Sequence, residues 1–190
     1  MIELNGTKYE NPLFVFAMES EAAQQFEDVE TLFTSLGKVN AAYELTKKIA
    51  QTRPDIVINL GTAGSNQFAK GETVCCTGFV QRDMDVGELG FEKYKTPFSP
   101  EEPILAYGLK INSLSEGICG TGDSFETGHA ETVYSVVDME AYALALICKR
   151  EQIPFLCVKY ISDGADDNAA TDWTEQVKLA AEALRKAVLS

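Results

Sequence analysis

Carboxylate side chains follow several apolar runs of this 190-residue chain, at points where a strand would end. Carboxylates that converge in one cleft raise one another's pKa, and acid/base chemistry makes use of such groups. Any single one could equally be solvated or cap the helix that follows it. The acidic residues at these points are Glu19, Glu21, Asp123, Asp138, Glu140, Asp163, Asp166 and Asp167, and the neighbouring hydroxyl residues are Thr62, Ser124 and Ser162.

The apolar runs themselves predict the elements that would position these side chains. Residues 55–60 are nearly all apolar and end at a turn signal, Gly61-Thr62-Ala63-Gly64. Pro54 ends the helix that precedes them, and Thr171 or Asp172 can cap a final helix that extends to about residue 187. We expect strands over 13–17, 55–60, 72–81, 117–121 and 155–161, a brief apolar run over 133–137, helices over 37–52 and 139–152, and a long loop over 83–103.

Several of the predicted strands are continuous apolar runs, as in strands buried on both faces. Because these strands alternate with helices, we predict an α/β fold with a mostly parallel sheet, in a single domain over residues 1–190. Ligands of such folds bind beyond the carboxyl ends of the strands. A parallel sheet would therefore bring several of the carboxylates to one edge.

The composition excludes other classes of protein. Lys and Arg total 16 against 29 Asp and Glu, for a net charge of -13, which disfavours binding to nucleic acid and to anionic membranes. No apolar run approaches the roughly 18 residues of a membrane span, and the N-terminus lacks the pattern of a signal peptide. The five cysteines are odd in number and show no CxxC spacing, so we expect reduced, buried thiols in a cytoplasmic protein.

The sequence lacks several common motifs for nucleotide binding, hydrolysis and metal binding. Phe125 stands where the dinucleotide fingerprint that starts at Gly120 needs a glycine, and there is neither a P-loop nor a GxSxG. His129, the only histidine, is interpreted as a loop residue. A metal site built from Asp163, Asp166, Asp167 and Asn168 is conceivable, but these residues lack the spacing of an EF-hand, so we expect no metal there. No organic cofactor is expected either.

A series of short motifs resembles the methylthioadenosine/S-adenosylhomocysteine nucleosidases of the nucleoside phosphorylase superfamily. They occur in the family's order and cover nearly the whole chain from residue 13 onward. The matching segments are Ala17-Met18-Glu19-Ser20-Glu21, Gly37-Lys38-Val39-Asn40-Ala41-Ala42, Ile58-Asn59-Leu60-Gly61-Thr62-Ala63-Gly64, Arg82-Asp83-Met84-Asp85-Val86, Gly122-Asp123-Ser124-Phe125, Val137-Asp138-Met139-Glu140-Ala141 and Ile161-Ser162-Asp163-Gly164-Ala165-Asp166.

This resemblance implies a three-layer α/β/α sandwich, usually a homodimer, that hydrolyses the bond between an adenine-type base and ribose. It implies that Glu21 activates the attacking water and that Asp163, oriented by Ser162, protonates the purine. The substrate-binding residues that it implies are Thr62, Phe125 stacked on the purine, Met139 and Glu140 as the ribose clamp, and Trp173 near the mouth of the 5′ pocket.

Three alternatives to this activity remain: a purine nucleoside phosphorylase, another hydrolase of the superfamily acting on futalosine or nucleotides, and a catalytically inactive nucleoside-binding protein. Relatives that bind phosphate place arginines in the first-strand loop, whereas residues 22–30 here hold three carboxylates and no cation. Only Arg82 is expected near the cleft, so we predict hydrolysis. Segments 22–36 and 126–136 are shorter than in typical relatives.

Overall fold

The structure is a computed structural model that describes residues 1–128, 131–166 and 169–189. The described elements are the helices α1 (Glu19–Ala22), α2 (Lys38–Gln51), α3 (Ala141–Glu151) and α4 (Ala169–Leu189), one 3-10 turn η1 (Gly87–Leu89), and the strands β1 (Ile2–Leu4), β2 (Thr7–Tyr9), β3 (Pro12–Phe16), β4 (Thr31–Phe33), β5 (Ile56–Gly64), β6 (Thr73–Gln81), β7 (Leu105–Ala106), β8 (Ser115–Thr121), β9 (Val136–Asp138) and β10 (Phe155–Asp163).

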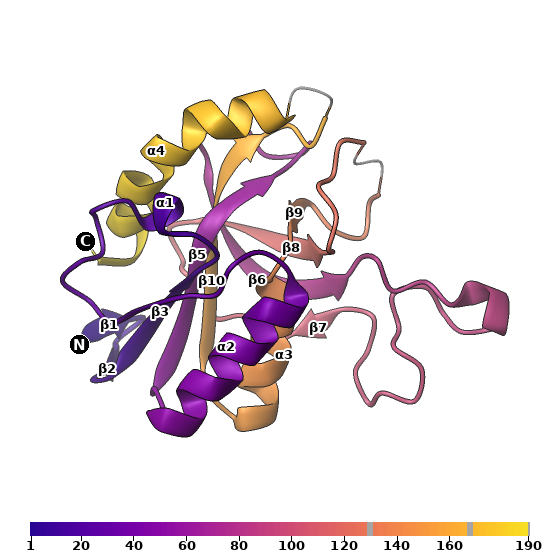
Figure 1. The fold of residues 1–190 in the computed structure, drawn as a ribbon, viewed down its shortest axis with the longest axis horizontal. Helices are drawn as coiled ribbons and strands as arrows, with labels where there is room; N and C mark the ends of the chain where they lie inside the picture. Colours follow the sequence, from indigo (N-terminus) through magenta and orange to yellow (C-terminus); the bar gives the residue numbers. More distant parts are fainter. Residues whose placement is uncertain (129–130, 167–168, 190) are drawn as a thin grey trace.

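Helices cover both faces of the central sheet, with α2 and α3 on one side and α1 and α4 on the other (Figure 1). The sequence of β10 shows why both faces are buried. Phe155, Cys157 and Ile161 pack in the cluster that includes α2 and α3, while the intervening Leu156 and Val158 pack in the cluster that includes α4. A strand with apolar side chains on both faces forms the middle of three layers, which confirms the predicted α/β/α sandwich.

The sheet is mixed and mostly parallel. Strand β5 lies between β3 and β10 and is parallel to both, and β8 is parallel to β6 and β9. The antiparallel pairs are β10 with β6, β5 with β9, and β6 with β7. Because β10 pairs with both β5 and β6, the strands β5, β10, β6, β8 and β9 close into a ring. This closure brings the ends of β5, β8, β9 and β10 around one space.

Two predicted boundaries are wrong. Residues 61–64 form no turn: β5 continues through Gly64, because Ala63 pairs in register with Ile161 of β10. The final helix begins at Ala169 rather than at a cap at Thr171 or Asp172. Alanine favours helix, and the Asp172 carboxylate pairs with Lys70 instead of capping.

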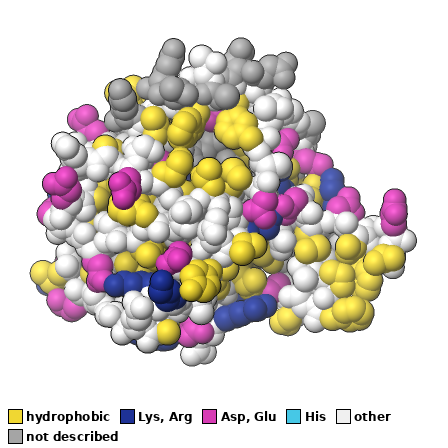
Figure 2. Space-filling view, viewed as in Figure 1, with side chains coloured by type: hydrophobic (Ala, Val, Ile, Leu, Met, Phe, Trp, Pro, Cys, Tyr) yellow, Lys and Arg dark blue, Asp and Glu magenta, His cyan; other side chains and the backbone are white. Residues whose placement is uncertain are grey.

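Residues 83–103 leave the body of the molecule as an arm, which we call the 83–103 arm (Figure 1). Apart from η1 this arm has no helix or strand, as predicted. Figure 2 shows apolar side chains gathered on the surface of the arm. Of the arm's apolar residues, Leu89 is 76% and Phe98 is 96% exposed. Among the described residues, no helix is both long and apolar enough to cross a bilayer.

Candidate active site

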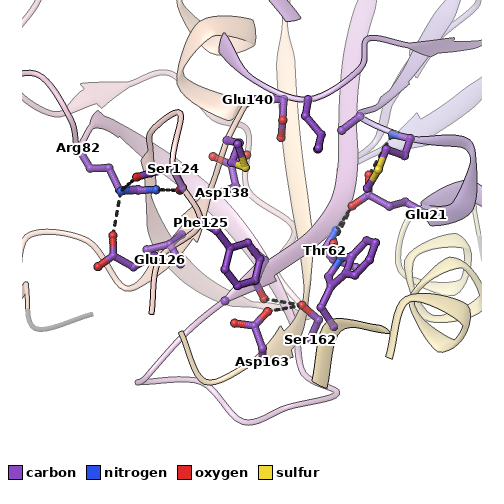
Figure 3. Close-up of a pocket in the computed structure, with 18 residues that line it drawn as sticks. Glu21, Thr62, Arg82, Ser124, Phe125, Glu126, Asp138, Glu140, Ser162 and Asp163 are labelled. Carbon is purple, nitrogen blue, oxygen red and sulfur yellow. Dashed lines mark hydrogen bonds and ion pairs between the residues drawn. The ribbon is translucent and has the colours of Figure 1, made fainter. Parts of the chain in front are cut away.

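A cavity of about 230 Å³ opens where the ring of strands ends. Side chains from distant parts of the chain point into it, with Glu21 and Thr62 on one side, Glu140 on another, and Asp163 with Ser162 opposite Glu140 (Figure 3). The described residues that line it are Ala17, Met18, Glu21, Leu36, Thr62, Ala63, Gly64, Arg82, Ser124, Phe125, Glu126, Val137, Asp138, Met139, Glu140, Ser162, Asp163 and Trp173.

Helix α1 places Glu21 against β5. The Thr62 N–H donates to Glu21 Oε1 over 2.8 Å and the Thr62 hydroxyl donates to the same oxygen over 2.7 Å. The Met18 N–H donates to Oε2 over 3.3 Å. A Cβ on Gly61 would lie 3.0 Å from Glu21 Oε1, so the glycine leaves the space that this carboxylate occupies. Glu21 is buried and held by three donors, as a fixed general base would be.

Asp163 ends β10 on the far side of the cavity. The Ser162 hydroxyl lies 2.7 Å from Asp163 Oδ2, and the Ala165 N–H donates to Oδ1 over 2.9 Å. A Cβ on Gly64 would lie 2.6 Å from Oδ1, closer than such contacts allow. Both oxygens of Asp163 are therefore positioned by hydrogen bonds and by close approach of β5.

Glu140 lies at the start of α3, where the Gly37 N–H donates to its Oε1 over 2.8 Å. Burial, together with the nearby Asp138 carboxylate, raises the pKa of Glu140 from 4.5 to about 8. The Lys159 ammonium and the Gly37 N–H oppose that rise. Glu140 is thus a buried acceptor with one oxygen bonded to the protein backbone.

Beneath Glu140 lies a buried ion pair. Lys159 Nζ is 2.9 Å from Asp138 Oδ2, with the two side chains only 3% and 1% exposed. Burial would raise the pKa of Asp138, but the Lys159 ammonium outweighs it and holds that pKa below its usual value. Burial likewise disfavours the charged lysine, yet Asp138 keeps the pKa of Lys159 well above its usual value. Thr121 Oγ1 and the Ala141 N–H also donate to Asp138, over 2.6 and 2.9 Å.

Phe125 lies on the loop after β8, and Arg82 holds that loop (Figure 3). Arg82 Nη1 is 2.8 Å from Glu126 Oε2 and 3.2 Å from Ser124 Oγ, and Nη2 donates to the Ser124 carbonyl. A Cβ on Gly122 would lie 2.8 Å from the Arg82 guanidinium carbon. The Arg82 charge is therefore engaged by the loop that carries Phe125.

The structure brings all the predicted site residues together. Glu21, Thr62, Phe125, Met139, Glu140, Ser162, Asp163 and Trp173 all line the cavity. Other strand-end carboxylates lie elsewhere: Glu19 is exposed and Asp123 pairs with Lys38. His129, Asp167 and Asn168 lie outside the described residues. In the described part of the chain, no cluster of three or more His, Cys, Asp or Glu side chains has the arrangement of a metal site.

The sequence motifs did not indicate Lys159 or Glu126. A lone lysine inside the apolar run 155–161 was a usable signal, because a buried lysine needs a partner. Nothing in the sequence pattern marks Glu126, since its place depends on the conformation of the loop after β8.

Comparisons with known proteins agree with this geometry. The family model described as the phosphorylase superfamily matches residues 27–190. The 5′-methylthioadenosine/S-adenosylhomocysteine nucleosidase of Haemophilus ducreyi is 33% identical over 184 residues, covering 85% of this chain and 78% of that protein. The protein of the same name from a Marinomonas species is 32% identical over 177 residues, covering 82% of this chain and 77% of its own length.

Solved structures share the fold at lower identity. The nucleosidase of Helicobacter pylori in complex with butyl-thio-DADMe-Immucillin-A aligns with a TM-score of 0.85 and 20% identity, covering 93% of this chain and 94% of that one. A futalosine hydrolase mutant of the same organism aligns with a TM-score of 0.85 and 19% identity, covering 93% and 95%. The chain therefore belongs to the phosphorylase superfamily, and its place among these relatives makes it a nucleosidase, an N-glycosyl hydrolase.

Proposed function

We propose that this enzyme hydrolyses the N-glycosidic bond of adenine nucleosides of the 5′-methylthioadenosine and S-adenosylhomocysteine type. The observation that carries this proposal is the convergence of three buried carboxylates, Glu21, Glu140 and Asp163, on one cavity. Breaking the bond needs a base for water, a grip on the ribose and an acid for the departing purine, and each carboxylate takes one of these tasks.

Water attacks the anomeric carbon of the ribose while the bond from that carbon to the purine nitrogen breaks. Glu21 accepts a proton from the water, and its negative charge faces the positive charge that develops on the sugar. Asp163 in its acid form donates a proton to purine N7, so the base leaves neutral. Its second oxygen accepts from a 6-amino group, which favours adenine over 6-oxo purines.

Glu140 holds the ribose by accepting hydrogen bonds from the vicinal hydroxyls. The Gly37 N–H fixes its Oε1, and the Asp138–Lys159 ion pair supports the turn into α3 from below. Phe125 stacks on the purine, and Met139 packs beside the ribose. Replacement of the Glu140 carboxyl group by an amide, or removal of a ribose hydroxyl, leaves one partner without its hydrogen bond, which weakens binding.

The charges around the cavity support water rather than phosphate as the nucleophile. Among the described residues lining the cavity, Arg82 is the single cation, and it already pairs with Glu126. The acidic lining residues are Glu21, Glu126, Asp138, Glu140 and Asp163. A phosphate dianion beside Glu21 would be repelled, whereas a water molecule is polarised there.

A nucleoside panel tests the substrate class. The panel contains 5′-methylthioadenosine, S-adenosylhomocysteine, adenosine, 2′-deoxyadenosine, inosine and futalosine, and chromatography measures the free base. We expect the 6-amino ribosides to be cleaved fastest, with 2′-deoxyadenosine and inosine poor. Cleavage of futalosine in preference to every adenine nucleoside would instead assign the enzyme to futalosine hydrolysis.

We also propose that two copies associate through the 83–103 arm. Two large apolar side chains of the arm, Leu89 and Phe98, are largely exposed, and a second copy of the chain would bury them. Phe98 stacks edge-on against Phe91, with the ring centroids 5.5 Å apart. Sedimentation equilibrium should give a dimer, and Leu89→Glu with Phe98→Glu should give a monomer; a monomeric parent protein would contradict this.

The five cysteines are buried and unpaired, which supports a reducing compartment, and we propose the cytoplasm. Fractionation of the source cells, with the protein detected by antibody, tests this location. Recovery of the protein outside the cytoplasmic fraction would contradict it.

A further inference from the structure

A series of hydrogen bonds connects Trp173 on helix α4 to Glu21, the proposed general base on α1. Trp173 Nε1 lies 2.9 Å from Thr62 Oγ1, and Thr62 Oγ1 lies 2.7 Å from Glu21 Oε1. The three residues come from α4, β5 and α1, and all three line the cavity. The hydrogen bonds therefore link three separate elements along one wall of the cavity.

The direction of each hydrogen bond follows from the chemistry of the groups. An indole nitrogen can only donate, and an ionised carboxylate can only accept. The Thr62 hydroxyl has one hydrogen, so it accepts from Trp173 and gives that hydrogen to Glu21. The indole therefore favours the rotation of the hydroxyl that donates to Glu21, and polarises it toward the carboxylate.

This arrangement makes the two oxygens of Glu21 unequal. Oε1 accepts two short hydrogen bonds, from the backbone N–H and the hydroxyl of Thr62, at 2.8 and 2.7 Å. Oε2 accepts the long 3.3 Å bond from the Met18 N–H. Oε1 thus has its two lone pairs occupied, and Oε2 keeps the capacity to accept a hydrogen from water.

Contacts on both sides of Trp173 hold its helix in place. Asp172 pairs with Lys70, and Gln176 Oε1 accepts from the Tyr160 hydroxyl of β10 over 2.8 Å. The hydrogen bond to Asp172 raises the pKa of Lys70 above its usual value. The indole is therefore presented to Thr62 by a helix that contacts the connection between β5 and β6 one residue before it and strand β10 three residues after it.

We propose that Trp173 is a positioning residue for the hydrolysis, which acts through the Thr62 hydroxyl to hold Glu21 with Oε2 turned toward the attacking water. This role is separate from that of an aromatic wall of the pocket, because it depends on the indole N–H and not on the ring. The inference rests on the proposed function, since it takes Glu21 as the base.

A double-mutant cycle on Trp173 and Thr62 tests the role. Trp173→Phe keeps a ring and removes the N–H, and should lower kcat about three- to tenfold while KM stays within about twofold. Thr62→Val removes the hydroxyl and should lower kcat further. In the Thr62→Val background, Trp173→Phe should have no additional effect on kcat, whereas in the Thr62→Ser background its effect should persist.

Trp173 is the only tryptophan of the chain, so an NMR spectrum of ¹⁵N-labelled protein contains one indole N–H signal. In the protein without substrate, Thr62→Val should move that signal upfield because the acceptor is lost, and Thr62→Ser should leave it near its original position. This measurement needs no activity, and it also reports whether each variant is folded.

The two measurements separate the possible failures. Equal effects of Trp173→Phe on kcat in the Thr62→Val and Thr62→Ser backgrounds, or an effect on KM alone, would overturn the positioning role. An indole N–H signal whose chemical shift is unchanged in Thr62→Val would contradict the hydrogen bond between Trp173 and Thr62. If the nucleoside panel yields no free base while the signal responds as expected, the proposed function fails and the hydrogen-bond chain stands.

Discussion

At the scale of single residues, Glu21, Asp163 and Glu140 each have a different environment, and these differences support the tasks proposed for them. Glu21 accepts from three donors, Asp163 accepts from one hydroxyl and one backbone N–H, and Glu140 accepts from one backbone N–H next to a buried ion pair. We therefore propose that residues of one chemical type serve as base, acid and ribose acceptor because their partners differ.

Asp163→Asn should lower kcat by a factor on the order of 10² to 10⁴, because an amide cannot donate a proton to the purine. The side chain keeps its size and an acceptor oxygen, so the thermal midpoint should change little. Initial rates of base release, with circular dichroism as the control for folding, check this. Turnover near that of the parent enzyme would remove Asp163 from the acid role.

Glu140 gives a prediction about pH and stability in the absence of substrate. Its pKa is about 8 in the folded protein against 4.5 for the ordinary group, so between these values the folded state retains a proton that the unfolded state has lost. The stabilisation is complete below pH 4.5 and is lost as pH rises through about 8. Glu140→Gln lacks this proton equilibrium.

The measurement is the thermal midpoint of the parent and of Glu140→Gln at several pH values across that window. We expect the midpoint of the parent protein to fall relative to that of the variant as pH rises. Two curves that run parallel would show that Glu140 has an ordinary pKa, which would contradict the buried environment described for it.

At the scale of elements, β5 leaves space for the two proposed catalytic carboxylates because it has glycine at two positions. Gly61 makes room for Glu21, and Gly64 makes room for Asp163. Neither glycine has a positive φ, so these positions require glycine for its small volume and not for its backbone freedom. The strand therefore brings its backbone close to both side chains.

Gly64→Ala should reduce kcat at least about 100-fold, since its Cβ would lie 2.6 Å from Asp163 Oδ1 and displace that carboxylate. Gly128→Ala is a matched control, because in the described part of the chain no atom other than those of its sequence neighbours lies within 4 Å of the Cβ it would add. Rates for the two variants, compared with the parent, check the prediction. Equal rates for both would show that the close approach of β5 has no role in positioning Asp163.

Most elements could be predicted because their apolar runs are continuous. A predicted boundary was wrong where a local turn signal competed with pairing between strands. The glycines of residues 61–64 indicated a turn, yet pairing with β10 extends the strand through them. Asn5-Gly6 does form the tight turn between β1 and β2, with φ of 49° and 80°, but the strands beside it were too short to be predicted.

The candidate site was predictable for a different reason. Its residues follow the ends of apolar runs, and the motifs that resemble the family name the same positions. The strands before them run in two directions, however, because β3, β5 and β10 are parallel to one another while β8 and β9 are antiparallel to them. Closure of the strands into a ring, and not the one parallel edge that was predicted, brings these residues together. Lys159 and Glu126 were not found, because their places depend on contacts between segments far apart in the sequence. The indole donor to Thr62 likewise depends on the position of α4 against β5.

At the scale of the whole molecule, closure of the strands into a ring gathers carboxylates from distant segments into one cavity. The chain as a whole carries a net charge of -13, and the single cation among the described lining residues is already paired. This distribution of charge opposes a phosphate anion at the site and leaves water as the nucleophile.

The sugar product of the reaction tests that claim most directly. Enzyme is incubated with 5′-methylthioadenosine in matched buffers with and without inorganic phosphate, and the sugar is identified by mass spectrometry and a reducing-sugar assay. We predict free 5-methylthioribose at the same rate in both buffers. A requirement for phosphate, with 5-methylthioribose 1-phosphate as the product and loss of activity in Arg82→Ala, would contradict the account and make this enzyme a phosphorylase.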